Sequence, residues 1–546
     1  MNKQTPEVDM MEGRVHGDEK SQGPFHEALG PMRAKSDDLS VWATMRLYKV
    51  AGIIAMAGAF SASLDGYQIN LNGGIVSNKG FIKQMAGGGK KIIAGRYISA
   101  WGGIQSAGQT IGQLLIQYVT EAYGRKVSLL IILAMFITSV MTESFANNWQ
   151  HWLVAKLLSG MGVGMLQCTM PLYLAEVAPT QLRGVFINAY TFWFVLGQLF
   201  ASVALYELKA ADPTDYKTPI YTQWAMVGLA GIIFVLLPES PWWLVSKGRF
   251  EKASKSLRIL NRGVEAFNVQ EHINVMDATI QMENDLAAKN KEEDMWEVFR
   301  GRNLIRFIIC SWPKVTQQFV GLAVFNTYAT YFWCEANSVV QYAGNKNPFL
   351  VTVILSSVQL LSMILTSTLT DQLGRRPLTV YPYAVTVLSV LSLGIIGCFD
   401  YTDKTLSSLL IFFACLATFS TTGASSIGYA YAAEMPQQRL RARTSAWALA
   451  ASNAISVMFS FTTPIMINGD DTHWGVKTAF FFAGTGTVAV AIAWLILPEV
   501  ARRTPAEIDE LFEKRVPLRK FKGYVTEVEM HATEVQQSTK ISDMNI

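Results

Sequence analysis

Glu121-Ala-Tyr-Gly-Arg-Lys126 follows a long apolar stretch of this sequence, and Asp371-Gln-Leu-Gly-Arg-Arg376 follows another, with the two Gly-Arg pairs 250 residues apart. Two further short patterns recur in the same order, at offsets of 258 and 260 residues: Glu176-Val-Ala-Pro179 with Glu434-Met-Pro436, and Pro238-Glu239 with Pro498-Glu499. Three markers at nearly constant offsets indicate that the chain contains a duplicated unit.

Each unit contains six apolar stretches of roughly 20 residues, the length at which a helix crosses a bilayer. The twelve predicted spans cover residues 48–70, 98–119, 127–145, 150–174, 184–206 and 221–238 in the first unit, and residues 305–332, 348–370, 378–398, 405–431, 444–465 and 476–497 in the second. These stretches are too long and too continuous for the strands of a membrane β-barrel. The sequence therefore predicts an all-α membrane protein with twelve transmembrane helices in two six-helix halves.

The composition agrees with a large surface facing lipid. Half of the 546 residues are hydrophobic and only 16% are charged, whereas about 25% are charged in an average soluble domain. The net charge of +4 is small and the basic residues are scattered, so the sequence predicts no nucleic-acid partner. The sequence has no CxxC pair, Cys/His cluster, phosphate-binding GxxxxGKS/T loop, nucleophile elbow or HExxH motif. We therefore predict neither an enzyme nor a bound cofactor or metal.

The charges of the loops predict the orientation. Lys and Arg residues gather after the even-numbered spans, although the loop after the first span is basic as well. Under the positive-inside rule, both termini and the segment between the two halves lie in the cytosol. The predicted division of the chain is a cytosolic arm (1–47), a first half (48–238), cytosolic linker helices (239–304), a second half (305–500) and a cytosolic tail (501–546).

Acidic and basic side chains recur at the predicted cytosolic helix ends of both halves. They are Glu121, Arg125, Glu176, Arg183 and Glu239 in the first half, and Asp371, Arg375, Glu434, Arg441 and Glu499 in the second. Two facing units with a site between them are typical of alternating-access carriers, so we interpret these residues as a cytosolic gate. Ion pairs among them would hold the cytosolic side shut and separate when the cavity opens inward. The alternative is that basic residues are kept in the cytosol by topology and make only weak surface pairs.

Taken in order, these motifs resemble those of the sugar porters of the major facilitator superfamily. The resemblance extends from about residue 50 to 515, and its motifs are the two Gly-Arg loops, Pro238-Glu-Ser-Pro-Trp-Trp-Leu244, Gln317-Gln318 with Gly321, and Pro498-Glu-Val-Ala-Arg-Arg-Thr504. Glu434-Met-Pro-Gln-Gln-Arg-Leu-Arg441 is similar to the matching segment of fungal maltose and α-glucoside permeases. The resemblance implies a plasma-membrane carrier for a sugar, either an α-glucoside such as maltose or a hexose.

A sugar site needs side chains that both donate and accept hydrogen bonds, and aromatic faces that cover the apolar faces of the ring. The resemblance places Gln317 and Gln318 at the paired sugar-binding glutamines of the seventh helix. It implies further contacts from Gln359, Tyr429, Asn453, Thr191 and Tyr328, with Asn326 as a nearby polar residue. Each of these residues could instead link two helices. Ala323 and Thr327 replace an Asn and a Tyr of the family, so the pocket chemistry is altered.

Proton symporters of this family resemble one another in a first-helix Gly-Tyr-Asp and a fourth-helix Arg, whose charge stabilises the ionised carboxylate. Here Gly66-Tyr67 is followed by Gln68, and the Arg position is Lys156. Asp65 could carry the proton instead, or could be an acidic residue near the wet end of its span. Because both members of the pair have changed, the sequence favours facilitated diffusion over proton symport.

Two alternative functions keep the same fold. The altered pocket is compatible with a polyol, a sugar acid or another sugar-like metabolite as cargo, moved inward or outward. A non-transporting sugar sensor is disfavoured, because only about 45 residues follow the last predicted span and they contain no clear repeat.

Overall fold

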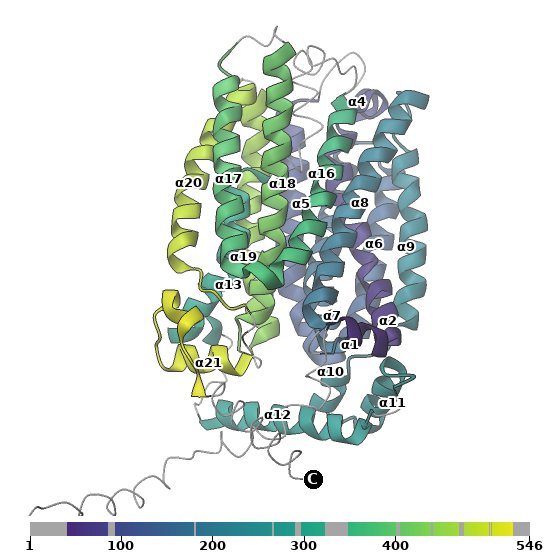
Figure 1. Cartoon of the computed structure of the whole chain (residues 1–546). Helices are drawn as coiled ribbons and strands as arrows, with labels where there is room; N and C mark the ends of the chain where they lie inside the picture. Colours follow the sequence, from purple (N-terminus) through teal and green to yellow (C-terminus); the bar gives the residue numbers. More distant parts are fainter. Residues whose placement is uncertain are drawn as a thin grey trace, which may run out of the picture.

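The protein is helical throughout the part of the chain that the computed structural model describes. The described residues are 41–85, 93–179, 182–264, 267–289, 296–322, 348–399, 404–437, 440–468, 474–501, 503 and 505–527. Two groups of long helices stand side by side, and each group comes from one half of the sequence (Figure 1).

Six helical spans make up each group. In the first half they are α2 (Lys49–Ala59) with α3 (Ser61–Ile75), α5 (Gly95–Tyr123), α6 (Arg125–Phe145), α7 (Trp149–Val177), α8 (Arg183–Ala211) and α9 (Thr218–Leu236). In the second half they are α13 (Gly301–Phe319), α16 (Pro348–Leu373), α17 (Arg375–Ile396), α18 (Lys404–Glu434), α19 (Arg441–Asn468) and α20 (Thr478–Ile496). Ten of the twelve are long and apolar enough to cross a membrane by themselves, counting α2 and α3 as one. The other two predicted spans, α5 and α13, are more polar, and the seventh predicted span runs on into residues outside the described part.

The polar residues of α5 lie along one face of the helix. Gln105, Gln109, Gln113 and Gln117 recur every fourth residue, and all four are buried. Residues four apart share one face of a helix, so the polar stripe faces the protein interior and the apolar remainder of α5 can face lipid.

Close helix contact fixes the position of this stripe. A Cβ atom added at Gly160 of α7 would lie 2.1 Å from the carbonyl oxygen of Gln105, and one added at Gly108 would lie 2.5 Å from the carbonyl oxygen of Leu157. The backbones of α5 and α7 therefore approach each other as closely as small residues permit in membrane bundles.

The two ends of the bundle differ. Four helices outside the twelve spans lie at one end, which we call the linker end (Figure 1): α10 (Pro241–Ser246), α11 (Phe250–Leu260), α12 (Val269–Lys289) and α21 (Pro505–Glu513). The short helix α4 (Lys79–Met85) lies at the opposite end. The linker end is the predicted cytosolic side.

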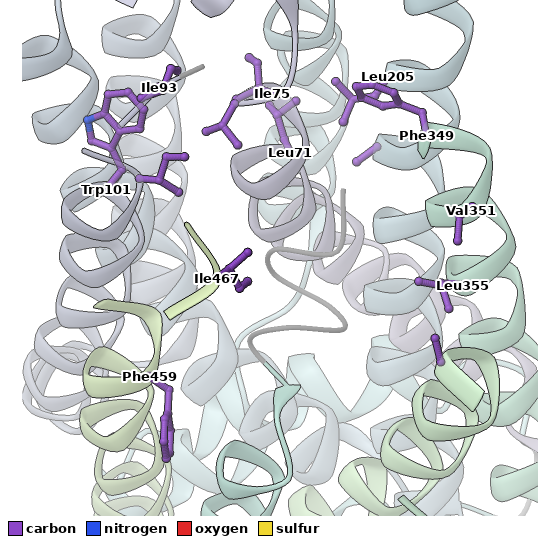
Figure 2. Close-up of a cluster of buried hydrophobic side chains, with 14 of the residues drawn as sticks. Leu71, Ile75, Ile93, Trp101, Leu205, Phe349, Val351, Leu355, Phe459 and Ile467 are labelled. Carbon is purple, nitrogen blue, oxygen red and sulfur yellow. The ribbon is translucent and has the colours of Figure 1, made fainter. Parts of the chain in front are cut away.

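At the opposite end, a cluster of buried apolar side chains joins the two halves (Figure 2). The first half contributes Leu71, Ile75, Ile93, Trp101 and Leu205, and the second contributes Phe349, Val351, Leu355, Phe459 and Ile467. Two hydroxyl contacts accompany the cluster, Ser202 with Ser356 at 2.8 Å and Ser106 with Ser460 at 3.1 Å. The halves therefore touch each other at this end.

Candidate substrate cavity and its charge networks

A cavity lies between the two halves, with an empty volume of about 1060 Å³ that includes its open mouth. Its lining is rich in amide and hydroxyl groups, including Gln105, Gln109, Gln167, Thr191 and Gln198 from the first half and Gln317, Gln318, Thr422, Ser425, Tyr429, Ser452 and Asn453 from the second. Lys314 is the one charged side chain among the described residues that line it. Such a surface suits a cargo with many hydroxyl groups, because amides and hydroxyls offer both donors and acceptors.

Five of the predicted binding residues line this cavity: Gln317, Gln318, Thr191, Tyr429 and Asn453. Gln359 is buried in α16 but does not line the cavity, whereas Met363, one helical turn nearer the linker end, does. The role of Gln359 in cargo binding therefore stays a prediction. Tyr328 and Asn326 lie outside the described residues.

The paired glutamines have free amide groups. Within the described part of the chain, neither Gln317 nor Gln318 makes a side-chain hydrogen bond, although both line the cavity. The hydroxyl of Thr191, by contrast, donates to the carbonyl oxygen of Asn188 in its own helix at 2.9 Å. The two glutamines are therefore better placed than Thr191 to exchange their contacts with water for contacts with a cargo.

Several lining residues were not predicted from the sequence. Gln105 and Gln109 belong to the buried stripe of α5, and their four-residue spacing was visible in the sequence. Gln167 and Lys314 were missed because each lies among other polar residues of its helix and belongs to no regular pattern. For Lys314, its position three and four residues before Gln317 and Gln318 was the signal that could have identified it.

A second cavity, with an empty volume of about 600 Å³, lies between the halves toward the linker end. Thr120, Arg441 and Ser445 are among its lining residues. Gln167 and Tyr429 line both cavities, so the two spaces adjoin. Together they extend from the middle of the bundle toward the linker end.

Asp65 lies fully buried within the first half rather than at the wet end of its span. Its carboxylate accepts hydrogen bonds from the hydroxyl of Tyr190 at 3.0 Å and from the amide of Gln167 at 3.1 Å. Both donors are neutral, and Gln167 lines the two cavities. Asp65 can therefore gain or lose a proton without breaking an ion pair.

Lys156 is fully buried and pairs with Glu143, whose Oε1 lies 2.9 Å from its Nζ. Glu143 also accepts from the amide of Gln223 at 3.1 Å and from that of Gln68 at 3.4 Å. The amides of Gln68 and Gln223 contact each other as well. The predicted coupling residues thus separate into two sites, because Gln68 and Lys156 belong to the Glu143 network and Asp65 does not.

Glu143 was absent from the sequence prediction. It lies in the last turn of α6, next to a polar segment, and so looked like the end of a span. Its side chain points inward instead and supplies the carboxylate that Lys156 needs, because a buried ammonium group is costly without a partner.

At the linker end of the first half, three predicted gate residues form one network. The guanidinium of Arg125 donates to both carboxylate oxygens of Glu176, at 2.8 and 2.6 Å. Glu239 accepts from the backbone N–H of Arg125 at 2.9 Å. The loop residue Gly124 has a φ of 98°, which favours glycine. These contacts fix the starts of α6 and α10 against the end of α7.

The second half repeats this geometry. Arg375 lies 3.3 Å from Glu434, and Glu499 accepts from the backbone N–H of Arg375 at 2.9 Å. Gly374 has a φ of 93°. The repeat seen in the sequence therefore places the same set of contacts at the same end of both halves.

The predicted gate needs a correction. The pairs Arg125–Glu176 and Arg375–Glu434 each join helices of one half, so they do not cross the space between the halves. Among the described residues, an ion pair that does cross it joins Glu121 of α5 to Arg443 of α19, at 3.1 Å. Glu121 was predicted and Arg443 was not. Arg441 lines the linker-end cavity, and the side chains of Arg183 and Asp371 lie outside the described part.

Comparison with known proteins gives a consistent result. The profile of a family described as "Sugar (and other) transporter" matches residues 54–512. The general α-glucoside permease of Saccharomyces cerevisiae strain S288c is 29% identical over 429 residues, which are 77% of this chain and 68% of that protein. Maltose permease MAL61 of Saccharomyces cerevisiae is 28% identical over 423 residues, which are 76% of this chain and 67% of that protein.

Solved structures share the fold. The proton:xylose symporter XylE bound to 6-bromo-6-deoxy-D-glucose has a TM-score of 0.69 and 21% identity, covering 86% of this chain and all of that one. The inward-open xylose transporter XylE from E. coli has a TM-score of 0.64 and 21% identity, covering 84% of this chain and 99% of that one. These matches confirm the predicted resemblance and the all-α fold with two six-helix halves.

Proposed function

Because this chain belongs to the sugar (and other) transporter family, we propose that it moves a polyhydroxylated, sugar-sized cargo across a membrane by alternating access. The relatives described above are permeases, which supports transport rather than catalysis as the activity. The names of these relatives suggest an α-glucoside such as maltose as the first cargo to test, with a hexose as the next. We place the protein in the plasma membrane because of its resemblance to fungal permeases, and both termini in the cytosol on the basis of the loop charges.

The observation that carries the proposal is the pair of glutamine amides that line the cavity between the halves. Gln317 and Gln318 line that cavity without side-chain hydrogen bonds in the described part of the chain. Each amide offers two donors and an acceptor, which matches a hydroxyl group that both donates and accepts. Tyr429 adds an aromatic face in the same cavity.

The contact pattern also indicates how transport would be gated. The apolar cluster of Figure 2 joins the halves at one end, and Glu121–Arg443 joins them at the other. Alternating access requires these two contacts to break in turn while the cargo site stays between them. The contacts within each half, such as Arg125–Glu176, would persist through the cycle.

For the energy source, facilitated diffusion remains our proposal, because Gln68 cannot titrate. In the competing mechanism, proton symport, a buried carboxylate would carry the proton, and the candidates are Glu143 and Asp65. Protonation of Glu143 would leave the buried Lys156 without a partner, whereas Asp65 has only neutral donors. If uptake proves to be coupled to protons, Asp65 is therefore the residue to test.

The experiment is uptake of labelled maltose and glucose by yeast cells that lack their own sugar carriers, with and without a protonophore. We expect saturable uptake that survives the protonophore. Loss of uptake with the protonophore would contradict this expectation and indicate symport. Symport through Asp65 would be established if Asp65→Asn still exchanged labelled for unlabelled sugar across the membrane in the presence of the protonophore. Absence of uptake of either sugar, with the protein at the cell surface, would contradict the proposed cargo class.

A matched pair of variants tests the site. Gln317→Leu removes an amide that lines the cavity, and Gln359→Leu removes a buried amide that does not. We expect Gln317→Leu to raise the KM for the transported sugar roughly 10-fold, since a lost hydrogen bond costs about 1 kcal/mol or more. Equal effects of the two variants would contradict the assignment of the site.

A further inference from the structure

Lys314 is an unusual charge within the membrane bundle. It lies in α13, three and four residues before Gln317 and Gln318, so the three side chains share one helix face. It lines the central cavity and is only 7% exposed. Its Nζ donates to the hydroxyl of Ser425 at 3.1 Å and lies 3.5 Å from the centre of the Tyr429 ring.

The other buried cations of the described residues all contact a carboxylate. Lys156 pairs with Glu143, Arg306 with Asp509, Arg125 with Glu176 and Arg375 with Glu434. Lys314 has no carboxylate within ion-pair distance in this part of the chain. A buried ammonium group normally needs such a partner, because removal of the charge from water is costly.

Asp65 does not fill this role by contact. Its carboxylate is held by Tyr190 and Gln167, and the Tyr190 ring makes an edge contact with Tyr429, on which Lys314 lies. The two opposite charges therefore act on each other at a distance, from different halves of the protein. An ammonium group has three N–H donors, and Ser425 takes one, so donor capacity remains toward the cavity.

From this geometry we propose that Lys314 binds a carboxylate group of the cargo, so that the carrier accepts sugar acids: polyhydroxylated molecules with one carboxylate. The neighbouring Gln317 and Gln318 would bind the hydroxyl groups of the same molecule. A single ammonium group, with the Asp65 carboxylate buried in the other half, favours a monoanion over a doubly charged phosphate, which proteins usually bind with several cationic or backbone donors. The inference deepens the proposed function and rests on it.

Competition provides the first test, and it needs no variant. Unlabelled gluconate, glucuronate and sorbitol are added to cells that take up labelled glucose or maltose through this protein. We expect the two acids to inhibit uptake at concentrations roughly 10-fold lower than sorbitol does, since a hydrogen bond to a charged group is worth about 1.5–3 kcal/mol. Inhibition by sorbitol at the same concentrations as the acids would overturn the inference.

Direct uptake provides the second test. The ratio of labelled gluconate uptake to labelled glucose uptake is measured for the wild-type protein, Lys314→Gln, Lys314→Arg and the control Lys477→Gln, whose lysine is exposed outside the cavity. We expect the ratio to fall roughly 10- to 100-fold in Lys314→Gln, to fall less in Lys314→Arg, and to stay at the wild-type value in the control.

A double variant separates cargo binding from simple charge compensation. If Lys314 only balances the charge of Asp65, Asp65→Asn will restore uptake of both cargoes in the Lys314→Gln background, and the inference is overturned. If Lys314 binds the cargo carboxylate, the double variant will keep the lowered ratio. If the wild-type protein takes up glucose but neither takes up nor binds gluconate, the inference is overturned and the proposed function is not. Failure of both cargoes would contradict the proposed function and the inference with it.

Discussion

The two halves of this protein are alike at the linker end and different inside the membrane. At the linker end each half has a glycine with positive φ, followed by an arginine whose backbone N–H donates to a glutamate at 2.9 Å. Each arginine side chain also pairs with a second glutamate at the end of a long helix, Glu176 or Glu434. This framework was duplicated as a unit.

The interior of the membrane region shows the contrast. Glu143 and Lys156 form a buried ion pair in the first half. At the repeat offsets of 250 and 258 residues, the corresponding positions are Leu393 and Ala414, which are both buried among apolar side chains. The second half instead has Lys314, which no carboxylate contacts in the described part of the chain. The comparison indicates that the linker-end contacts serve the fold of each half, whereas the charges inside the membrane serve functions that the halves do not share.

The largest expected effect comes from breaking the buried pair. Lys156→Ala leaves Glu143 as an uncompensated charge and should destabilise the protein by about 3–5 kcal/mol. Glu143→Leu combined with Lys156→Ala gives the first half the residues of the second half at these positions. The double variant should recover most of the loss, because apolar replacement of a buried pair is often close to neutral. The melting temperature of the purified protein in detergent measures both effects.

Lys247→Met is the control for this experiment, because Lys247 is exposed at the linker end and should change stability by less than about 0.5 kcal/mol. A Lys156→Ala variant as stable as this control would show that the pair contributes nothing to the difference between the halves. A double variant that is stable but inactive would assign Glu143 and Lys156 to transport itself.

A smaller effect, equal in both halves, is expected at the repeated glycines. An alanine Cβ at Gly124 would lie 2.6 Å from Glu239, and one at Gly374 would lie 2.5 Å from Glu499. Each substitution should therefore cost about 1–3 kcal/mol, from backbone strain and displacement of the glutamate. Gly248→Ala has the strain alone, with a φ of 66° and nothing within 4 Å, and should cost less, about 1 kcal/mol. Clearly unequal losses at Gly124 and Gly374 in thermal unfolding would contradict the equivalence of the two networks.

The repeat made some charged residues easy to identify from the sequence, and others without a counterpart were missed. Arg125, Glu176 and Glu239 were identified because each has a counterpart in the second half. That they pair with one another within one half was not predicted, since a sequence offset locates a helix end without fixing the direction of a side chain. Glu143 has no counterpart and lies beside a polar loop, so no pattern distinguished it. Gln359 was expected to bind the cargo through the family resemblance alone, and the residue of α16 that lines the cavity is Met363, one helical turn away.

The same limit applies to charges that act across the two halves. Glu121 and Arg443 are 322 residues apart, and they meet only because α5 of one half packs against α19 of the other. Helical periodicity identifies the inward face of each helix, but it does not reveal which two helices face each other. The fold was therefore predictable from the sequence, whereas the contact that joins its two halves at the linker end required the structure.

The smallest energetic effect belongs to this cross-half pair, and it concerns conformation more than stability. Both side chains are nearly two-fifths exposed, so Glu121→Gln should cost no more than about 1 kcal/mol. Because the pair exists only while the halves are together at the linker end, its loss should shift the population toward the state that is open there, by up to about fivefold. The measurement is the rate of maleimide labelling at Ser445→Cys, which lines the linker-end cavity, in a protein without its native cysteines. Glu510→Gln, which weakens the pair of Glu510 with Lys514 within the C-terminal segment, should leave that rate unchanged. If both variants accelerate labelling equally, an ion pair that joins the two halves has no more effect on opening than one that does not. Glu121–Arg443 would then be an ordinary surface pair rather than a gate.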